Sequence, residues 1–375
     1  MKFSENVLRS EEKAIYRLRE LYSQYGYARY KVSKFEEYDL YAHNKNFLVS
    51  ENILTFTDTN GRLMALKPDV TLSIVKNVGN DDCQTHKLYY NENVYRTSPD
   101  ADGFREIVQT GLECIGKIDL YLTCEVLMLA QKSLSVISAD HILDLSHMGF
   151  VSGLLEFAAS EGADAKEILQ AVGNKNTAAV RARCAQLGVA EDVVEDLCRV
   201  TALYEPLQSA LVGLAPMVRG EKMKEALCEL EQISRMMRIY GCDERIYLDF
   251  SIINDMNYYN GIMFRGFVNG IPEGILSGGR YDSLLAKMGK RSEAIGFAVY
   301  LNLLERFGEQ GAAYDVDTVL LYDDSVSVEK VMEAVRVFRT NGRTVRAENG
   351  TQTSSRCRQL CRITKGGIEI LETND

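Results

Sequence analysis

The sequence has 375 residues, of which 46% are hydrophobic and 26% charged, values ordinary for a soluble globular chain of two or three domains. The formal net charge of −10 and the pI near 5.2 exclude a chain-wide basic surface for nucleic acid, although a local basic patch stays open. The nine cysteines form no CxxC pair, so we expect no metal site, no redox motif and no cofactor.

The first residues, MKFSENVLRSEEK, lack the apolar core of a signal peptide, and no apolar run reaches the length of a membrane helix. We therefore expect a cytoplasmic protein without a membrane partner. The first helix is expected to start at Ser10, with Ser10 as its cap, and to end at Gly26. A hairpin over 51–67 is expected to turn at Asn60-Gly61.

Further along, the pattern predicts a helix over 120–135 and a buried strand over 141–150. Residues from about 151 to 242 are rich in Ala, Leu and Glu and predict several amphipathic helices. Strand character then returns, and a small α/β unit is expected over 312–375. The fold class is therefore α+β, with an antiparallel sheet flanked by helices.

The most informative strand lies in the second half of the segment 87–116. Its period of two places Ile107, Gln109, Gly111, Glu113 and Ile115 on one face. An amide and a carboxylate there flank a glycine, and a glycine inside a strand often marks the close approach of a ligand or of another backbone. A small ligand with hydrogen-bond donors would suit this face, although an exposed polar face is the simpler alternative.

This segment resembles motif 2 of class II aminoacyl-tRNA synthetases, in the form found in histidyl-tRNA synthetases. Three further blocks agree in order: ALKPDVTLSIVK (65–76), NDMNYYNGIMFRGF (254–267) and SGGRYDSLLAKMG (277–289). The resemblance implies a synthetase-like core over 1–311 with a helical insertion at about 151–242. The unit over 312–375 resembles a shortened anticodon-binding domain.

The resemblance also implies a histidine-like pocket. Asp69 and Thr71 would bind the α-amino group, Gln109 the polar end of the amino acid, and Glu113 with Tyr259 the imidazole. The pocket that we expect is completed by Arg96, Tyr258 and Arg280. Simpler alternatives stay open: core aromatics for the two tyrosines, a structural ion pair for Arg280, and a turn with positive φ at Gly278 or Gly279.

The cationic groups that an adenylating enzyme needs are missing from their expected positions. Asn254 and Leu303 stand where the family has arginines, and Gly103 replaces a third. Losing one positioned group that stabilises developing charge typically costs about 10²–10³ in rate. We therefore expect no catalytic residues here.

A chain that keeps the amino-acid pocket but lacks the cations that contact ATP resembles the regulatory subunits of ATP phosphoribosyltransferase. These subunits are paralogues of histidyl-tRNA synthetase that act in histidine biosynthesis. This resemblance implies a short-form catalytic subunit as partner, homodimerisation within a hetero-oligomer, and histidine as a ligand for feedback. It implies no nucleic-acid partner. A divergent active histidyl-tRNA synthetase is the first alternative, and another amino-acid-binding or tRNA-binding module is the second.

Overall fold

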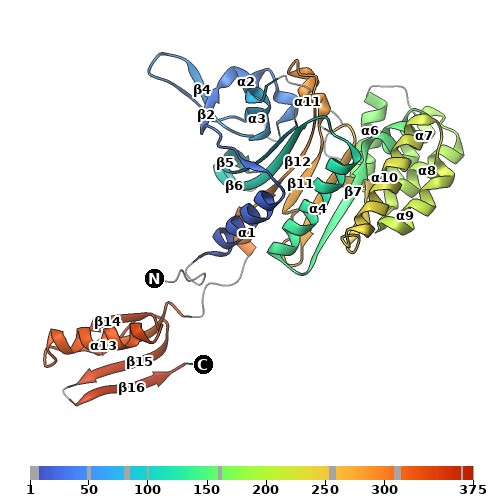
Figure 1. Cartoon of the computed structure of the whole chain (residues 1–375). Helices are drawn as coiled ribbons and strands as arrows, with labels where there is room; N and C mark the ends of the chain where they lie inside the picture. The colour runs from blue at the N-terminus through green and yellow to red at the C-terminus, as the bar shows by residue number, and fades with distance from the viewer. Residues whose placement is uncertain are drawn as a thin grey trace. The chain divides into compact units, whose positions relative to one another are not determined.

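The computed structural model describes residues 8–48, 52–79, 85–98, 101–158, 163–252, 259–307, 314–364 and 366–374. The chain divides into two compact units, 1–307 and 308–375, which are described separately below (Figure 1). The larger unit is a mixed α/β fold built on one large sheet flanked by helices, which confirms the expected fold class for the core.

In the described part of the chain the large sheet has nine strands in the order β1-β5-β6-β12-β11-β10-β7-β9-β8. From β5 to β7 along this order, each strand pairs antiparallel with the next. Strand β1 pairs in parallel with β5, and β9 pairs in parallel with β7. The strands span Ala28–Arg29 (β1), His86–Ser98 (β5), Ala101–Gly116 (β6), His141–His147 (β7), Glu205–Pro206 (β8), Ile246–Leu248 (β9), Ile262–Val268 (β10), Leu276–Arg280 (β11) and Glu293–Tyr300 (β12).

One face of this sheet is covered by the helices α1 (Ser10–Gln24), α4 (Leu120–Ile137) and α12 (Asn302–Phe307). Helix α4 lies across this face of the sheet (Figure 1). Leu112, Phe264 and Phe297 belong to the same buried apolar cluster as residues of α4, and the two phenylalanine rings are in contact. By length and composition α4 could cross a membrane, but 67% of it is buried inside the protein. Such burial is typical of the central helix of a core. We call this the apolar face.

The opposite face carries smaller elements above β5, β6 and β12. They are a three-stranded sheet of β2 (Phe35–Glu37), β3 (Thr55–Thr57) and β4 (Leu63–Leu66), with the helices α2 (Tyr38–Ala42), α3 (Thr71–Asn77) and α11 (Asp282–Lys287). Their apolar side chains form a second cluster with Tyr90 and Ile115 of the large sheet. Because polar side chains also lie here, we call this the polar face.

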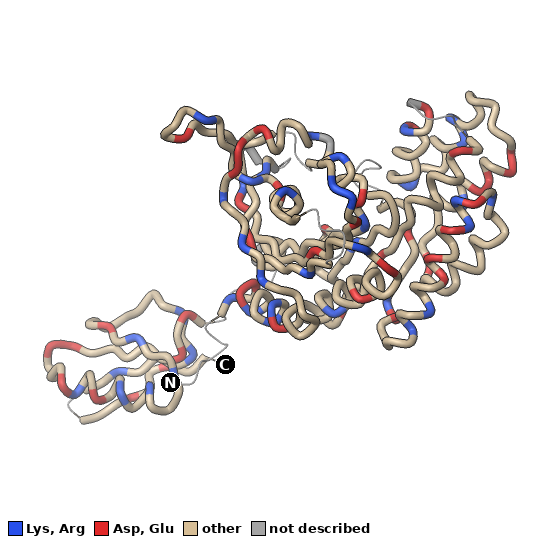
Figure 2. Tube along the Cα trace, turned by 45° about the horizontal axis from the view of Figure 1, so that its top comes forward, with Lys and Arg blue, Asp and Glu red and all other residues tan. Residues whose placement is uncertain are grey.

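The helical insertion follows β7. Its helices are α5 (Met148–Leu155), α6 (Ala163–Gly173), α7 (Thr177–Leu187), α8 (Glu191–Ala202), α9 (Leu207–Leu214) and α10 (Glu221–Ile239). Lys and Arg are interspersed with Asp and Glu along these helices, so no basic stripe runs over the part of the insertion that is described (Figure 2). Contacts of α10 with α4, which itself packs on the large sheet, join the insertion to the rest of the larger unit.

The smaller unit has one helix and a four-stranded sheet of order β14-β13-β15-β16 within its described residues. Its elements are β13 (Val316–Tyr322), α13 (Val328–Thr340), β14 (Val345–Asn349), β15 (Cys357–Thr364) and β16 (Gly367–Thr373). Strand β13 pairs in parallel with β14 and β15, and β16 returns antiparallel. Helix α13 packs on Leu320 and Cys361.

Three local predictions have clear outcomes. The hairpin with Asn60-Gly61 at its turn is confirmed, because β3 and β4 pair antiparallel around it. The cap of α1 is wrong by one residue: Arg9 is the N-cap, and its N–H donates to Oε2 of Glu12 at 2.9 Å. The strand over 141–150 is too long, because α5 starts at Met148, where the His147 ring accepts from the Gly149 N–H.

Candidate functional site

The polar face is built around three residues in register on neighbouring strands. Glu113 of β6 lies opposite Gly296 of β12, which lies opposite Gly279 of β11. Paired residues in an antiparallel sheet point to the same side, so Glu113 lies on the side of the sheet toward which a side chain at either glycine would point. A Cβ atom on Gly296 would lie 2.9 Å from Cδ of Glu113 and would collide with its carboxylate. The glycine therefore makes room for the acid.

The space above Gly111 is filled by the protein itself, not by a ligand. Tyr90 pairs with Gly111 across β5 and β6, and a Cβ atom on Gly111 would lie 2.6 Å from Cζ of the Tyr90 ring. Tyr90 is fully buried. The expectation that Gly111 leaves room for a ligand is therefore wrong, because the glycine admits a tyrosine from the neighbouring strand. The other expectation, the close approach of another backbone, is confirmed, because a Cβ atom on Gly111 would collide with the Phe297 carbonyl oxygen.

The double glycine of β11 serves both faces of the sheet. A Cβ atom on Gly278 would lie 2.7 Å from Cζ of Phe264 on the apolar face, whereas one on Gly279 would lie 2.6 Å from Cδ1 of Tyr259 on the polar face. Neither glycine has a positive φ. The suggestion of a strained turn is wrong, and close packing on both sides is the physical reason for these glycines.

Glu113 is 2% exposed and accepts two hydrogen bonds from hydroxyl groups. Thr71 at the start of α3 donates to Oε1 at 2.7 Å, and Tyr281 donates to Oε2 at 2.5 Å. Burial raises the pKa of Glu113 from 4.5 to about 8, and the two hydroxyl groups offset part of that rise. The structure thus brings Glu113 and Thr71 together, as the sequence predicted, and adds Tyr281.

Asp69 and Arg96 form a second polar pair beside this group. Nη2 of Arg96 lies 3.7 Å from Oδ2 of Asp69, while Nε of Arg96 donates to the Pro68 carbonyl at 2.7 Å. The Leu72 N–H donates to Asp69 at 2.8 Å. Burial raises the pKa of the Asp69 carboxyl, and Arg96 offsets part of that rise. Arg96 is therefore held against the Asp69 loop by two contacts.

Gln109 is 2% exposed, and among the described residues its Nε2 has no hydrogen-bond partner. Its cross-strand neighbour Glu92 binds Lys67, whose Nζ lies 2.6 Å from Oε2 of Glu92 and whose side chain is 1% exposed. A buried donor without a partner costs about 1–3 kcal/mol. A ligand with an acceptor, such as a carboxylate, would remove this cost.

Tyr259 belongs to the same side of the sheet. It is half-buried, packs against both apolar clusters, and its pKa is raised by burial and by the nearby hydroxyl of Tyr300. Tyr258 and Asn254 lie outside the described residues, so the predicted roles of these two positions stay predictions. Sequence reasoning missed Tyr281, Tyr90 and Lys67. The tyrosine within SGGRYD was the available signal for Tyr281.

Arg280 follows Gly279 and so points to the other side of the sheet, in register with Ile295. Its guanidinium forms ion pairs with Asp282 at 2.7 Å and with Glu293 at 2.6 Å. This geometry matches the structural alternative for Arg280. His147 is likewise a buried structural residue, with Nε2 at 2.9 Å from Oε2 of Glu229 on α10.

Leu303 stands where the synthetases that this chain resembles have a catalytic arginine. It lies on α12 and is 6% exposed in the apolar core. Its surroundings are those of a core residue and would not hold a cation without a partner. Among the described residues no group of three or more His, Cys, Asp or Glu side chains is arranged to hold a metal ion.

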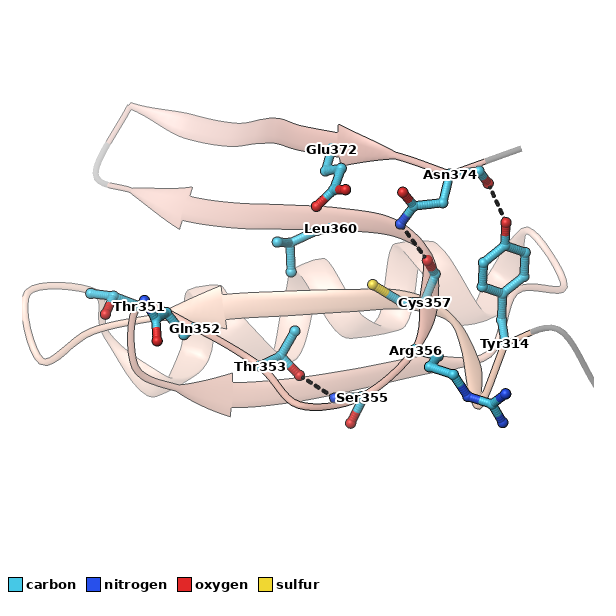
Figure 3. A pocket seen from close by; sticks show the side chains of 10 residues that line it. All are labelled: Tyr314, Thr351, Gln352, Thr353, Ser355, Arg356, Cys357, Leu360, Glu372 and Asn374. Atoms are coloured by element: carbon cyan, nitrogen blue, oxygen red, sulfur yellow. Dashed lines mark hydrogen bonds between the residues drawn. The ribbon is translucent and has the colours of Figure 1, made fainter.

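The smaller unit has a hollow of about 510 Å³ on the side of its sheet away from α13 (Figure 3). Cys357 and Leu360 line its apolar part, and Thr353, Ser355 and Glu372 supply polar groups. Ser355 donates its N–H to Thr353 at 3.0 Å, so part of the polar lining is satisfied internally. None of the residues predicted from the sequence for a site lies in this hollow.

Comparison with known proteins places the core within a family. The model of the family described as histidyl-tRNA synthetase matches residues 3–304. Two curated relatives, both named ATP phosphoribosyltransferase regulatory subunit, come from Ruminiclostridium cellulolyticum and Clostridium kluyveri. The first is 25% identical over 96% of this chain and 88% of its own length, and the second is 28% identical over 87% and 85%.

Solved structures support the same fold. The structure of an ATP phosphoribosyltransferase regulatory subunit/histidyl-tRNA synthetase from Bacillus halodurans aligns with a TM-score of 0.72 at 23% identity, over 92% of this chain and 90% of that one. The ATP phosphoribosyl transferase (HisG:HisZ) complex from Thermotoga maritima aligns with a TM-score of 0.61 at 16% identity, over 78% and 97%. These similarities show the fold.

Proposed function

We propose that this chain, which belongs to the histidyl-tRNA synthetase family, is a non-catalytic regulatory subunit of ATP phosphoribosyltransferase, as the two curated relatives above are named. It would assemble with the short-form catalytic subunit at the first step of histidine biosynthesis in the cytoplasm. The observation that carries this proposal is the difference between two parts of the site. The residues predicted for the amino-acid pocket include buried acids and an amide, whereas Leu303 is a core residue where adenylation would need a cation.

The pocket on the polar face is proposed to bind histidine. Asp69 would bind the ammonium group, Glu113 the imidazole, and the unpartnered Nε2 of Gln109 the carboxylate. Tyr259 would form an aromatic wall. Arg96 and Thr71 would hold Asp69 and Glu113 in place, and Arg280 would act outside the pocket, through its ion pairs.

Homodimerisation is proposed through the small three-stranded sheet. Phe35 and Phe56 are 47% and 37% exposed, and their rings meet edge to face with centroids 5.5 Å apart. Leu63 on the same sheet is 49% exposed. Exposed aromatic residues in one patch are typical of protein interfaces. We also propose that the unit 308–375 is a shortened counterpart of an anticodon-binding domain.

The test is co-purification with a short-form catalytic subunit, followed by phosphoribosyl-transfer assays with and without histidine. We expect a stable complex whose activity and histidine response differ from those of the catalytic subunit alone. Glu113→Gln should raise the histidine concentration for half-maximal response at least tenfold, because a charged hydrogen bond contributes about 1.5–3 kcal/mol. Tyr95→Phe, which removes an exposed hydroxyl bonded to Glu106, is the matched control and should change nothing.

Two outcomes would overturn the proposal. One is a catalytic subunit that is equally active and equally histidine-sensitive alone. The other is histidine-dependent ATP–pyrophosphate exchange by this chain, which would favour the alternative of an active synthetase.

A further inference from the structure

The surroundings of Glu113 differ from those of the other buried acids of the site. Its two hydrogen-bond partners, Thr71 and Tyr281, are hydroxyl groups, and a hydroxyl can both donate and accept. The same contacts therefore suit a carboxylate and a neutral carboxylic acid. Asp69, in contrast, is bound by the Leu72 N–H and faces Arg96, and these groups can only donate.

No cation among the described residues pairs with Glu113. Its charged neighbour is Asp69, which repels a second negative charge, and Arg96 is already engaged with Asp69. Tyr90 approaches from β5, and Tyr259 and Tyr281 approach from the sequence around β10 and β11. Burial raises the pKa of Tyr90 and that of Tyr259, so these two are neutral near pH 7, and Tyr281 donates its hydroxyl to Glu113. A buried carboxyl group without a cation keeps its proton because the charged form loses its hydration.

We propose that Glu113 stores a proton in the absence of ligand and passes it to the ring of a basic heteroaromatic ligand, with Tyr281 as the positioning residue. This inference rests on the proposed function, since it takes the imidazole of histidine as the ring. In the step, the O–H bond of Glu113 breaks and an N–H bond forms on the ring nitrogen. The product is a carboxylate paired with an imidazolium, and no proton is exchanged with solvent near neutral pH.

The pocket then selects its ligand by basicity as well as by shape. A ring that accepts the proton gains a charge-assisted hydrogen bond in a buried site, which is stronger than a neutral one. A ring of the same size but low basicity leaves Glu113 neutral and forms the weaker bond. L-histidine should therefore bind at least tenfold more tightly than 1,2,4-triazole-3-alanine, whose ring is far less basic.

The proton balance fixes the pH dependence of histidine binding. Between about pH 6.5, where free imidazole titrates, and about pH 8, where Glu113 titrates, the complex and the separate partners hold the same number of protons. The association constant should therefore be flat across this window. It should fall tenfold per unit below the window, where one proton must leave, and above it, where one must be taken up.

The experiment is isothermal titration calorimetry of the full chain with L-histidine, in pairs of buffers of different ionisation enthalpy, at pH 5.5, 7.5 and 8.5. We expect proton release at pH 5.5, no net exchange at pH 7.5, and uptake of most of one proton at pH 8.5. Glu113→Gln should remove the uptake at pH 8.5, apart from the small share that comes from the α-amino group of histidine. Subtracting the variant from the wild type isolates the contribution of Glu113.

Tyr281→Phe tests the positioning role. Losing a hydroxyl that stabilises the carboxylate should raise the pKa of Glu113 further and extend the flat window to higher pH. Tyr95→Phe removes a tyrosine–glutamate hydrogen bond on the protein surface and should leave the window unchanged. A purely structural role of Tyr281 would change the affinity without moving the window.

The outcomes separate the two proposals. Uptake of one proton by the wild type at pH 7.5, or affinity that falls steadily above pH 6.5, would mean that Glu113 is already ionised, and either result would overturn the stored proton while leaving histidine binding intact. Equal affinity for histidine and the triazole analogue would also overturn it. No binding of histidine at any pH would instead count against the histidine pocket of the proposed function.

Discussion

The two faces of the central sheet are built from the same strands but have opposite chemistry. On the apolar face Leu112 and Phe297 pack under α4. On the polar face, Glu113 and Gln109 are just as deeply buried, yet their neighbours are hydroxyl groups and other acids. Strand alternation thus separates the residues that hold the fold together from those that we propose bind a ligand, although they are adjacent in the sequence. Folding and binding should respond to different substitutions.

The largest expected effect tests the apolar face. Leu112→Ala should lower the free energy of unfolding by about 3 kcal/mol, because it removes a fully buried side chain and leaves a cavity. Urea denaturation measures this loss. Histidine affinity, measured by calorimetry on the folded variant, should stay within twofold of the wild type. A parallel loss of affinity would show that the two faces are coupled.

The next effect comes from the polar face and depends on pH. The folded protein holds the proton of Glu113 up to about pH 8, whereas the unfolded chain releases it near 4.5. Stability from this group is therefore fully present below pH 4.5 and is lost as the pH rises through 8, by about 1.4 kcal/mol per unit between these values. Urea denaturation at pH 5, 6 and 7 should show this slope for the wild type relative to Glu113→Gln. Parallel curves for the two proteins would refute it.

The smallest effect compares one buried serine on each side of the sheet. Ser146 of β7 is fully buried on the polar face, and among the described residues its hydroxyl has no partner. Ser133 of α4 is equally buried but is bonded to Tyr22 at 3.0 Å. Ser146→Ala should raise stability by about 1 kcal/mol, and Ser133→Ala should lower it by a similar amount. If thermal denaturation showed that both substitutions change stability in the same direction, this prediction would be contradicted.

Much of the fold was predictable because periodicity reports it directly. The alternation of β6 placed Gln109 and Glu113 on one face, and the helical insertion and the hairpin at Asn60-Gly61 followed from local patterns. Element ends were less predictable: α5 starts at Met148 because the His147 side chain caps it, a contact that hydrophobicity does not reveal.

Residues of the candidate site could be predicted where the residue type alone indicates its chemistry. They could not be predicted where contacts with neighbouring residues determine the role. Thr71 and Glu113 do lie together. The filling of the space above Gly111 by Tyr90 depends on cross-strand pairing. The sheet side of Arg280 follows from the exact end of β11. The SGGRYD motif could have drawn attention to Tyr281, but its hydrogen bond to Glu113 joins distant parts of the chain and follows only from the fold.

The adjacent glycines Gly278 and Gly279 offer a way to separate phenotypes genetically. A methyl group at the first would press on Phe264 beneath α4 and on the Gly296 carbonyl, and one at the second would press on Tyr259 beside the proposed pocket and on the Ile262 carbonyl. Both alleles should therefore lower protein abundance, and the second should in addition lower the metabolite response of the protein that remains folded. Comparing the growth of cells that carry each allele would show whether growth is limited by the loss of the metabolite response or by the loss of the protein.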